Sequence, residues 1–179
     1  MTPDEQKFMA FEALLGWTAA VVTQAQRVTA AGDKLLAEIQ RGFDLRSGRG
    51  LEAILRHRLA LQLFQTERQL FCNAAHKLLE HRLWVKELGF LDEALFDELD
   101  KFADDIKVMR DMNEHAIEYF KGKGKRPQDW IYVDPRTAGA DASSTVGTKI
   151  GGRLDWVELG SAAQGLLAKI SPMGPFFPP

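Results

Sequence analysis

The sequence predicts a mainly α protein, an antiparallel bundle of four to five helices followed by a small C-terminal β-hairpin and a closing helix. Between Asp4 and about Phe120 the chain has no proline, and its apolar residues recur at helical spacing. After Gly122 the composition changes to Gly, Ser, Thr and Pro, with short runs of β-branched and aromatic residues. We therefore divide the chain into a helical bundle, residues 1–124, and a C-terminal extension, residues 125–179, that packs on the same domain.

The composition is that of one ordinary globular domain. The chain has 179 residues, of which 45% are hydrophobic and 27% charged, enough for a single core. A net charge of −2 argues against a generally basic nucleic-acid-binding protein, although a local basic patch is compatible with it. The lone Cys72 excludes an intrachain disulfide and a cysteine-based zinc site, and it fits a reducing compartment with no disulfide-linked partner.

No signal peptide or membrane span is expected. The longest apolar run near the N-terminus, residues 8–22, is interrupted by Glu12 and is shorter than about 18 uninterrupted residues. It also follows the acidic pair Asp4 and Glu5, whereas a signal peptide begins with basic residues. We expect a soluble cytoplasmic protein that does not bind a membrane.

The first helix is expected to begin at Pro3. The Thr2 hydroxyl can cap it, and the acidic residues Asp4 and Glu5 favour the positive end of the helix dipole. Asp33 is expected to cap a short second helix that ends near Gly42.

A long helix is predicted next, over residues 51–88, because this segment contains neither Gly nor Pro. At ~1.5 Å per residue an unbroken helix of this length would span roughly 55 Å, longer than a compact domain of this size needs. The sequence therefore predicts either a kink in this helix or a partner chain beside it.

The last long helix of the bundle is expected from Asp92 to Lys121, ending at Gly122 and Gly124. Its apolar residues recur in alternating steps of three and four, broken only near Asn113, which indicates the seam of an antiparallel bundle. They are Leu95, Leu99, Phe102, Ile106, Met109, Ala116 and Phe120.

The extension is expected to hold short strands and one helix. Residues 130–133 and 145–150 are each typical of a strand, and a turn at Gly151 and Gly152 would lead to a third at residues 153–154. Asp155, with Glu158 three residues later, predicts a capped helix over residues 156–170. The tail, residues 171–179, carries Phe176 and Phe177, and together with the long helix it offers apolar surface for a homodimer.

Searches for familiar sites are negative, so no metal and no cofactor is expected. His76 and His81 lie five residues apart, which turns the second ring ~140° away from the first on a helix. The glycines near residue 150 lack the spacing of phosphate-binding loops, and no G-x-S-x-G motif occurs. Cys72 lies in an apolar stretch and is expected to be a small core residue.

One polar constellation could carry chemistry. Asp111, His115 and Tyr119 follow one another at intervals of four, so on a helix they form one stripe, with Arg110 beside it. A carboxylate, an imidazole, a phenol and a guanidinium could together support metal-free phosphodiester chemistry. Lys121 and Lys123 follow as auxiliary cations. The alternative is that these residues are simply the solvent-exposed stripe of an amphipathic helix.

The spacing of Arg110, Asp111 and His115, late in the last long helix of an all-helical bundle, resembles the HEPN superfamily. Its signature is an Arg and a His with four to six residues between them, commonly with Asn, Asp or His directly after the Arg. The continuation from His115 to Gly124 also looks like that of uncharacterised bacterial helical-bundle proteins of this type. The resemblance covers residues 110–124 closely and the preceding helices only by pattern.

The resemblance implies a homodimer in which two motif helices face each other and form an RNA-cleaving site. Many members are metal-independent endoribonucleases of toxin or defence systems, and others have lost activity. His115 would then move a proton during attack by the RNA 2′-hydroxyl, Arg110 would stabilise the phosphorane, and Asp111 would orient or polarise.

This chain departs from the superfamily in two ways. Tyr119 lies four residues after the His, whereas one toxin group has its tyrosine two residues after it, and the β-rich extension is unlike the minimal fold. A second function therefore stays open: a non-catalytic dimeric interaction or ligand-binding module in which the same residues form an interhelical polar network.

Overall fold

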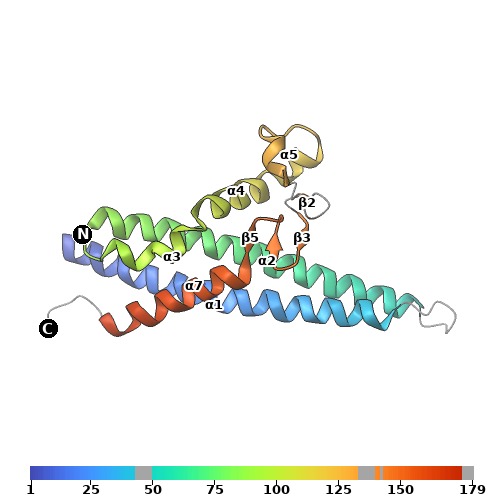
Figure 1. Ribbon diagram of the computed structural model, residues 1–179, viewed down its shortest axis with the longest axis horizontal. Helices are drawn as coiled ribbons and strands as arrows, with labels where there is room; N and C mark the ends of the chain where they lie inside the picture. Colours follow the sequence, from blue (N-terminus) through green and yellow to red (C-terminus); the bar gives the residue numbers. More distant parts are fainter. Residues whose placement is uncertain (43–49, 133–139, 142, 175–179) are drawn as a thin grey trace.

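The protein is built around a hairpin of two long helices that run the whole length of the molecule (Figure 1). The computed structural model describes residues 1–42, 50–132, 140–141 and 143–174. Helices α1 (Pro3–Arg41) and α2 (Gly50–Leu88) have 39 residues each and pack together antiparallel. The predicted fold class, a mainly α bundle with a small C-terminal hairpin and a closing helix, is confirmed.

Helix α1 begins as the sequence predicts. The Thr2 hydroxyl accepts a hydrogen bond from the Glu5 amide, and the Glu5 carboxylate accepts one from the Thr2 amide, so the capping box is complete. The predicted second helix starting at Asp33 is wrong, because α1 continues through Gly32 to Arg41. Glycine weakens a helix by only about 1 kcal/mol, and here a Cβ would lie 3.3 Å from the Phe64 ring of α2, so Gly32 lets the two helices approach closely.

Helix α2 is continuous, so the kink that its length predicted is absent. Helix α2 packs along α1 instead, and together the two helices extend beyond the rest of the bundle (Figure 1). No residue of α1 after Ala31 is buried, and before Ala60 the only buried residue of α2 is Gly50. We call residues 33–41 and 50–59 the distal arm.

Helix α1 is long and apolar enough, by length and composition alone, to cross a membrane. The expectation that this segment falls short of a spanning length was therefore too strict. Core helices of soluble proteins pass the same test. The buried face of α1 packs on α2 and on α7 (Trp156–Ile170), with Phe11, Leu14 and Val21 among its core residues.

The predicted continuous helix from Asp92 to Lys121 is divided into four pieces. They are the 3₁₀ turn η2 (Glu93–Phe96), α3 (Asp97–Asp100), α4 (Ala103–Glu114) and α5 (Ala116–Phe120). The backbone leaves regular α geometry at Phe102 and at His115, where ψ is −2° and 15°.

The seam is buried at Leu99, Ile106 and Met109, as predicted, but Phe120 is 66% exposed. The break at His115 rotates α5 away from the core, and Met112 takes the last buried position of α4.

The extension holds two small antiparallel sheets. In the first, β1 (Ile131–Tyr132) pairs with β2 (Ala140–Asp141) after the single turn α6 (Pro127–Trp130). In the second, β3 (Thr145–Val146), β4 (Lys149–Ile150) and β5 (Leu154–Asp155) are adjacent in that order. Residues 145–150 are therefore a tight hairpin rather than one strand, because the chain reverses at Gly147, where φ is +58°. The predicted turn at Gly151 and Gly152 joins β4 to β5.

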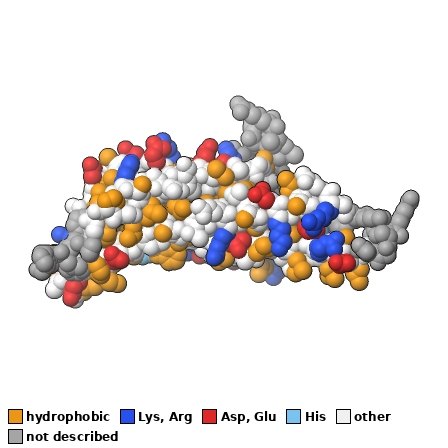
Figure 2. All heavy atoms as spheres, turned by 90° about the horizontal axis from the view of Figure 1, so that it is seen from below, with side chains coloured by type: hydrophobic (Ala, Val, Ile, Leu, Met, Phe, Trp, Pro, Cys, Tyr) orange, Lys and Arg blue, Asp and Glu red, His pale blue; other side chains and the backbone are white. Residues whose placement is uncertain are grey.

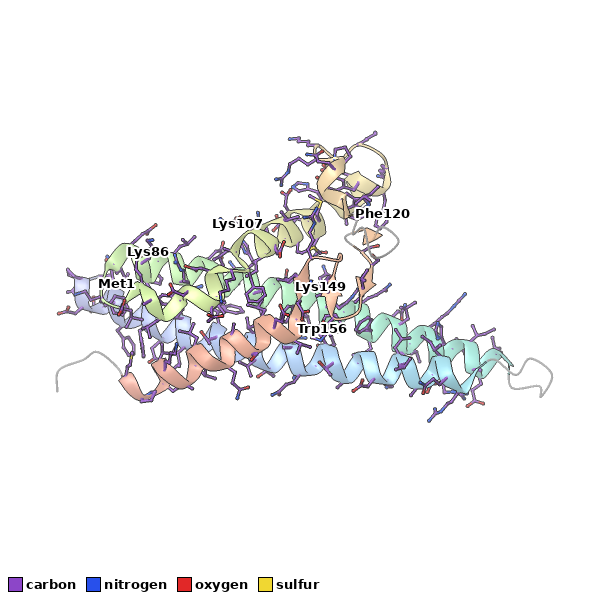
Figure 3. The ribbon with its side chains drawn as sticks, viewed as in Figure 1. Met1, Lys86, Lys107, Phe120, Lys149 and Trp156 are labelled. Atoms are coloured by element: carbon purple, nitrogen blue, oxygen red, sulfur yellow. The ribbon has the colours of Figure 1, made fainter. Side chains whose placement is uncertain are left out.

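The closing helix α7 covers residues 156–170, as predicted, and is followed by the 3₁₀ turn η3 (Ser171–Met173). The Asp155 carboxylate caps it by accepting hydrogen bonds from the amides of Val157 and Glu158. Trp156, labelled in Figure 3, donates its Nε1–H to the Thr29 hydroxyl of α1 at 3.1 Å. The helix thereby joins the same core as α1 and α2. Val133, Phe176 and Phe177 lie outside the described residues.

Candidate functional site

The predicted polar constellation lies where α4 leaves α2 and leads to α5. The part of the chain that begins at this junction, residues 115–132, stands away from the long helical hairpin (Figure 1). Asp111, His115 and Tyr119 border one small pocket of about 170 Å³. Its other lining residues are Glu118, Lys125 and Arg126.

Local backbone geometry keeps the three predicted residues on one side. The His115 amide donates to the Asp111 carbonyl at 3.1 Å, and the Tyr119 amide donates to the His115 carbonyl at 3.2 Å. The stripe therefore persists although His115 is the C-cap of α4 and the N-cap of α5. The predicted convergence of an acid, an imidazole and a phenol is what the structure shows.

Tyr119 is held from three sides. Its ring stacks on Trp130, with centroids 5.0 Å apart and planes 4° apart, and its hydroxyl accepts a hydrogen bond from the Arg126 amide at 3.3 Å. Gly124 lies so close that a Cβ there would fall within 2.6 Å of ring atoms of Tyr119. Only glycine allows the chain to pass the ring at this point, so Gly124 returns the chain to bring Lys125 and Arg126 to the pocket.

Several of the polar side chains that line the pocket already pair with one another. The Arg126 guanidinium donates to the Asp111 carboxylate, and His115 Nδ1 lies 3.3 Å from the Glu118 carboxylate. These side chains are 28–51% exposed, so water competes for all of them. An incoming anion could therefore replace Asp111 beside Arg126, or Glu118 beside His115, at a modest cost in free energy.

Arg110 does not line this pocket. Its Nε lies 2.8 Å from the Glu114 carboxylate one turn later, and the side chain is 44% exposed. Its charge acts on His76 of α2, whose pKa is lowered mainly by burial and further by Arg110 and Lys77. In a single chain, the guanidinium beside His115 therefore belongs to Arg126 and not to Arg110.

The auxiliary lysines Lys121 and Lys123 also lie outside the pocket. Both are exposed, and the Lys123 amide closes α5 by donating to the Glu118 carbonyl at 2.8 Å. Lys125 and Arg126, in contrast, come from the same basic run and do line it. Sequence reasoning placed this run only at the end of a helix, and the tight return at Gly124 is what brings its last two residues back to the pocket.

Cys72 and His81, which were also considered from the sequence, are part of the packing of the helices and not of a functional site. Burial raises the pKa of the Cys72 thiol to about 12, although Asn113 bonds to it, so the thiol stays protonated. The His81 Nδ1–H donates to the Lys77 carbonyl at 2.8 Å, and the ring lies beside the rings of Trp17 and Trp84. Within the ranges that the structure describes, no three His, Cys, Asp or Glu side chains are arranged as metal ligands.

No known protein-family model, curated protein or solved structure is significantly similar to this chain. The HEPN resemblance therefore rests on residues 110–124 alone.

Proposed function

We propose that the protein is a metal-independent endoribonuclease of the HEPN type, acting as a homodimer. The observation that supports this best is the convergence of His115, Tyr119, Lys125 and Arg126 on one small, solvent-accessible pocket. An imidazole, which can take up and release a proton, lines this pocket together with two cations that can hold a phosphate.

The proposed reaction uses the RNA itself as the nucleophile. His115 takes the proton of a 2′-hydroxyl, the 2′-oxygen attacks the adjacent phosphorus, and the bond to the 5′-oxygen breaks. His115 then returns the proton to the leaving 5′-oxygen, so that the products are a 2′,3′-cyclic phosphate and a 5′-hydroxyl. Arg126 and Lys125 stabilise the charge that develops on the phosphorus oxygens.

A second copy has a specific role in this proposal. Arg110, the residue that the resemblance assigns to the phosphorane, lies outside the pocket of its own chain and pairs with Glu114. Two α4 helices facing each other would allow the Arg110 of one copy to approach the His115 of the other, as the superfamily's composite site implies.

The test is an RNA-cleavage assay in EDTA with a fluorescent single-stranded RNA. We expect the wild type to cleave it and to leave the same sequence uncleaved when its 2′-hydroxyls are replaced by hydrogen. His115→Ala should abolish cleavage while leaving the melting temperature nearly unchanged, since the ring is about half exposed. Arg110→Lys should also fail, because an ammonium cannot make a bidentate phosphate contact.

Lys101→Ala is the matched control, because Lys101 is an exposed cation that pairs with Glu98 and lies outside both α4 and the pocket. It should cleave at the wild-type rate. Absence of cleavage by the wild type, or full activity of His115→Ala, would overturn the proposal.

The second candidate, a non-catalytic interaction module, is favoured by one observation. Arg110 and Glu114 form their ion pair within one chain and face His76, which is how an interhelical polar network would look. In that case Glu114→Gln should lower the free energy of unfolding, and none of the motif variants should change the extent of RNA cleavage.

A further inference from the structure

Five leucines on the outer face of α2 have no partner within the described part of the chain that buries them. Leu51, Leu55, Leu59 and Leu63 are spaced by four, and Leu70 follows on the same side of the helix. Their exposed fractions are 72, 51, 65, 37 and 44%. We call these five residues the leucine stripe.

The stripe is nearly free of charge. At 100° per residue, the uncharged Gln62, Thr66 and Asn73 fall within the same outer sector of α2, together with one charged residue, Glu52, and Arg58 falls at the edge of the sector. A stripe of this kind costs little to desolvate, and a soluble monomer rarely leaves such a surface uncovered. Figure 2 shows hydrophobic side chains exposed beside Lys and Arg at the arm end of the molecule.

We propose that the leucine stripe of α2 is a self-association surface that is covered by the same stripe of a second copy. The inference does not depend on RNA cleavage. It names a contact between copies on α2 that is distinct from the facing α4 helices of the proposed function, and its failure would leave the pocket around His115 untouched.

The pattern fits a second copy because it is self-complementary. A two-fold axis near residue 61 places Leu59 of one copy opposite Leu63 of the other. Thr66 meets Leu55 in this register, so no pair of like charges is brought together. The stripe carries one acid, Glu52, and has one base, Arg58, at its edge rather than charges of one sign, which a strongly acidic or basic partner would require.

The spacing also predicts how the helices cross. Side chains four residues apart form ridges inclined to the helix axis, and two such ridges interdigitate when the helices cross at about −50°. A stripe of four-residue steps therefore fits an inclined crossing centred near Leu59 and Leu63 better than a parallel coiled coil, whose apolar residues alternate in steps of three and four.

The size of the stripe sets the expected affinity. Twenty residues of helix are about 30 Å long and about 10 Å wide, roughly 300 Å² in projection. A stable interface buries about 800 Å² per partner, so the stripe alone supports a dimer of roughly micromolar rather than nanomolar affinity. The transition should then fall between about 1 and 200 µM protein.

The test is sedimentation velocity of the full chain across that concentration range. We expect the wild type to shift from monomer to dimer, and Leu59→Glu and Leu63→Glu each to weaken the dimer at least tenfold. The matched control is Leu83→Glu, since Leu83 lies on the same helix, outside the stripe, and is 43% exposed. It should dimerise as the wild type does, and circular dichroism should show all three variants to be folded.

A second measurement does not depend on introducing a charge. Cys72 is the sole cysteine and is buried, so it does not form a cross-link in the native protein. An equimolar mixture of Leu59→Cys and Leu63→Cys should give disulfide-linked heterodimers under mild oxidation, whereas Leu83→Cys should not form them.

Three results would overturn the proposal: a wild type that stays monomeric at 200 µM, equal effects at Leu59 and Leu83, or binding to lipid vesicles that Leu59→Glu abolishes while the protein in solution remains monomeric. The cleavage assay separates this proposal from the first one. If Leu59→Glu is monomeric and still cleaves RNA, the stripe forms the dimer, and cleavage does not need the Arg110 of a second copy. If the wild type dimerises and cleaves nothing, only the proposed function fails.

Discussion

At the scale of single residues, position in the sequence predicted which side chains are neighbours along one helix face but not which of them point into the pocket. Asp111, His115 and Tyr119 meet because intervals of four survive the break at His115. Arg110, which was predicted to lie beside this stripe, does not line the pocket, whereas Arg126, which was not among the predicted site residues, does. The first is captured by Glu114 one turn away, and the second returns through a turn that no helical periodicity describes.

The Cys72 thiol should be inert in the folded protein. Burial raises its pKa to about 12, so the reactive thiolate is almost absent at pH 8, and the side chain is 2% exposed. We expect a thiol-specific reagent such as DTNB to label native protein at least a hundredfold more slowly than protein in 6 M guanidinium chloride. Rapid labelling of the native protein would show that this part of the core opens readily.

His76 should make the protein less stable as the pH falls. Its folded pKa is lowered by burial, with Arg110 and Lys77 adding to the effect while Glu80 and Glu114 oppose it, so the ring resists protonation in the fold. The unfolded chain takes up the proton near pH 6.5. The free energy of unfolding is therefore unaffected by His76 above about pH 6.5, and it decreases as the pH falls below that value because only the unfolded chain binds the proton.

Melting curves between pH 7.5 and 5 should show this loss in the wild type and a flatter profile in His76→Gln. His81→Gln serves as the control, because it removes a histidine from the same helix one turn later. Identical slopes for wild type and His76→Gln would assign the pH dependence to other groups.

At the scale of elements, the sequence predicted the type and most ends of the long helices but missed several interruptions. Caps are local, and those at Thr2, Asp92 and Asp155 are all where the sequence places them. Continuity depends on tertiary contacts. Gly32 is retained inside α1 because Phe64 packs against it, whereas the stretch after Asp92, which contains no glycine or proline, still breaks at Phe102 and His115.

The cap of α7 should contribute measurably to global stability, because this helix closes the core. Asp155 accepts from two amides of the first turn and from the Thr148 hydroxyl at 2.7 Å, and it is 6% exposed. We expect Asp155→Ala to lower the free energy of unfolding by about 1–2 kcal/mol. Urea titration is the measurement, with Ser161→Ala on the exposed side of α7 expected to stay within about 0.5 kcal/mol.

At the scale of the whole molecule, the structure consists of a well-packed end and an exposed end. Helix α7, η2, α3 and α4 cover the hairpin over the half that contains both chain ends, while the distal arm extends beyond them (Figure 1). The sequence predicted this imbalance only as an excess of helix length. It could not assign the excess to a kink or a partner, since that choice depends on which residues of α1 face α2 in the folded chain.

The last prediction follows from this imbalance. With almost no buried side chains, the arm gains little from packing, so its amides should open locally at far lower free energy than those of the core. In hydrogen exchange at 2 µM, residues 50–59 should therefore exchange much faster than residues 71–79, although both segments belong to one continuous helix and the second is rich in buried residues such as Phe71, Ala75 and Leu78.

At 200 µM the two segments should become more alike, because a second copy of α2 would cover Leu51, Leu55 and Leu59 and add its binding free energy to the cost of opening the arm. The same comparison in Leu59→Glu should show no change with concentration. Slow exchange of residues 50–59 at both concentrations would mean that the arm is stable by itself, and fast exchange at both would mean that no second copy protects it.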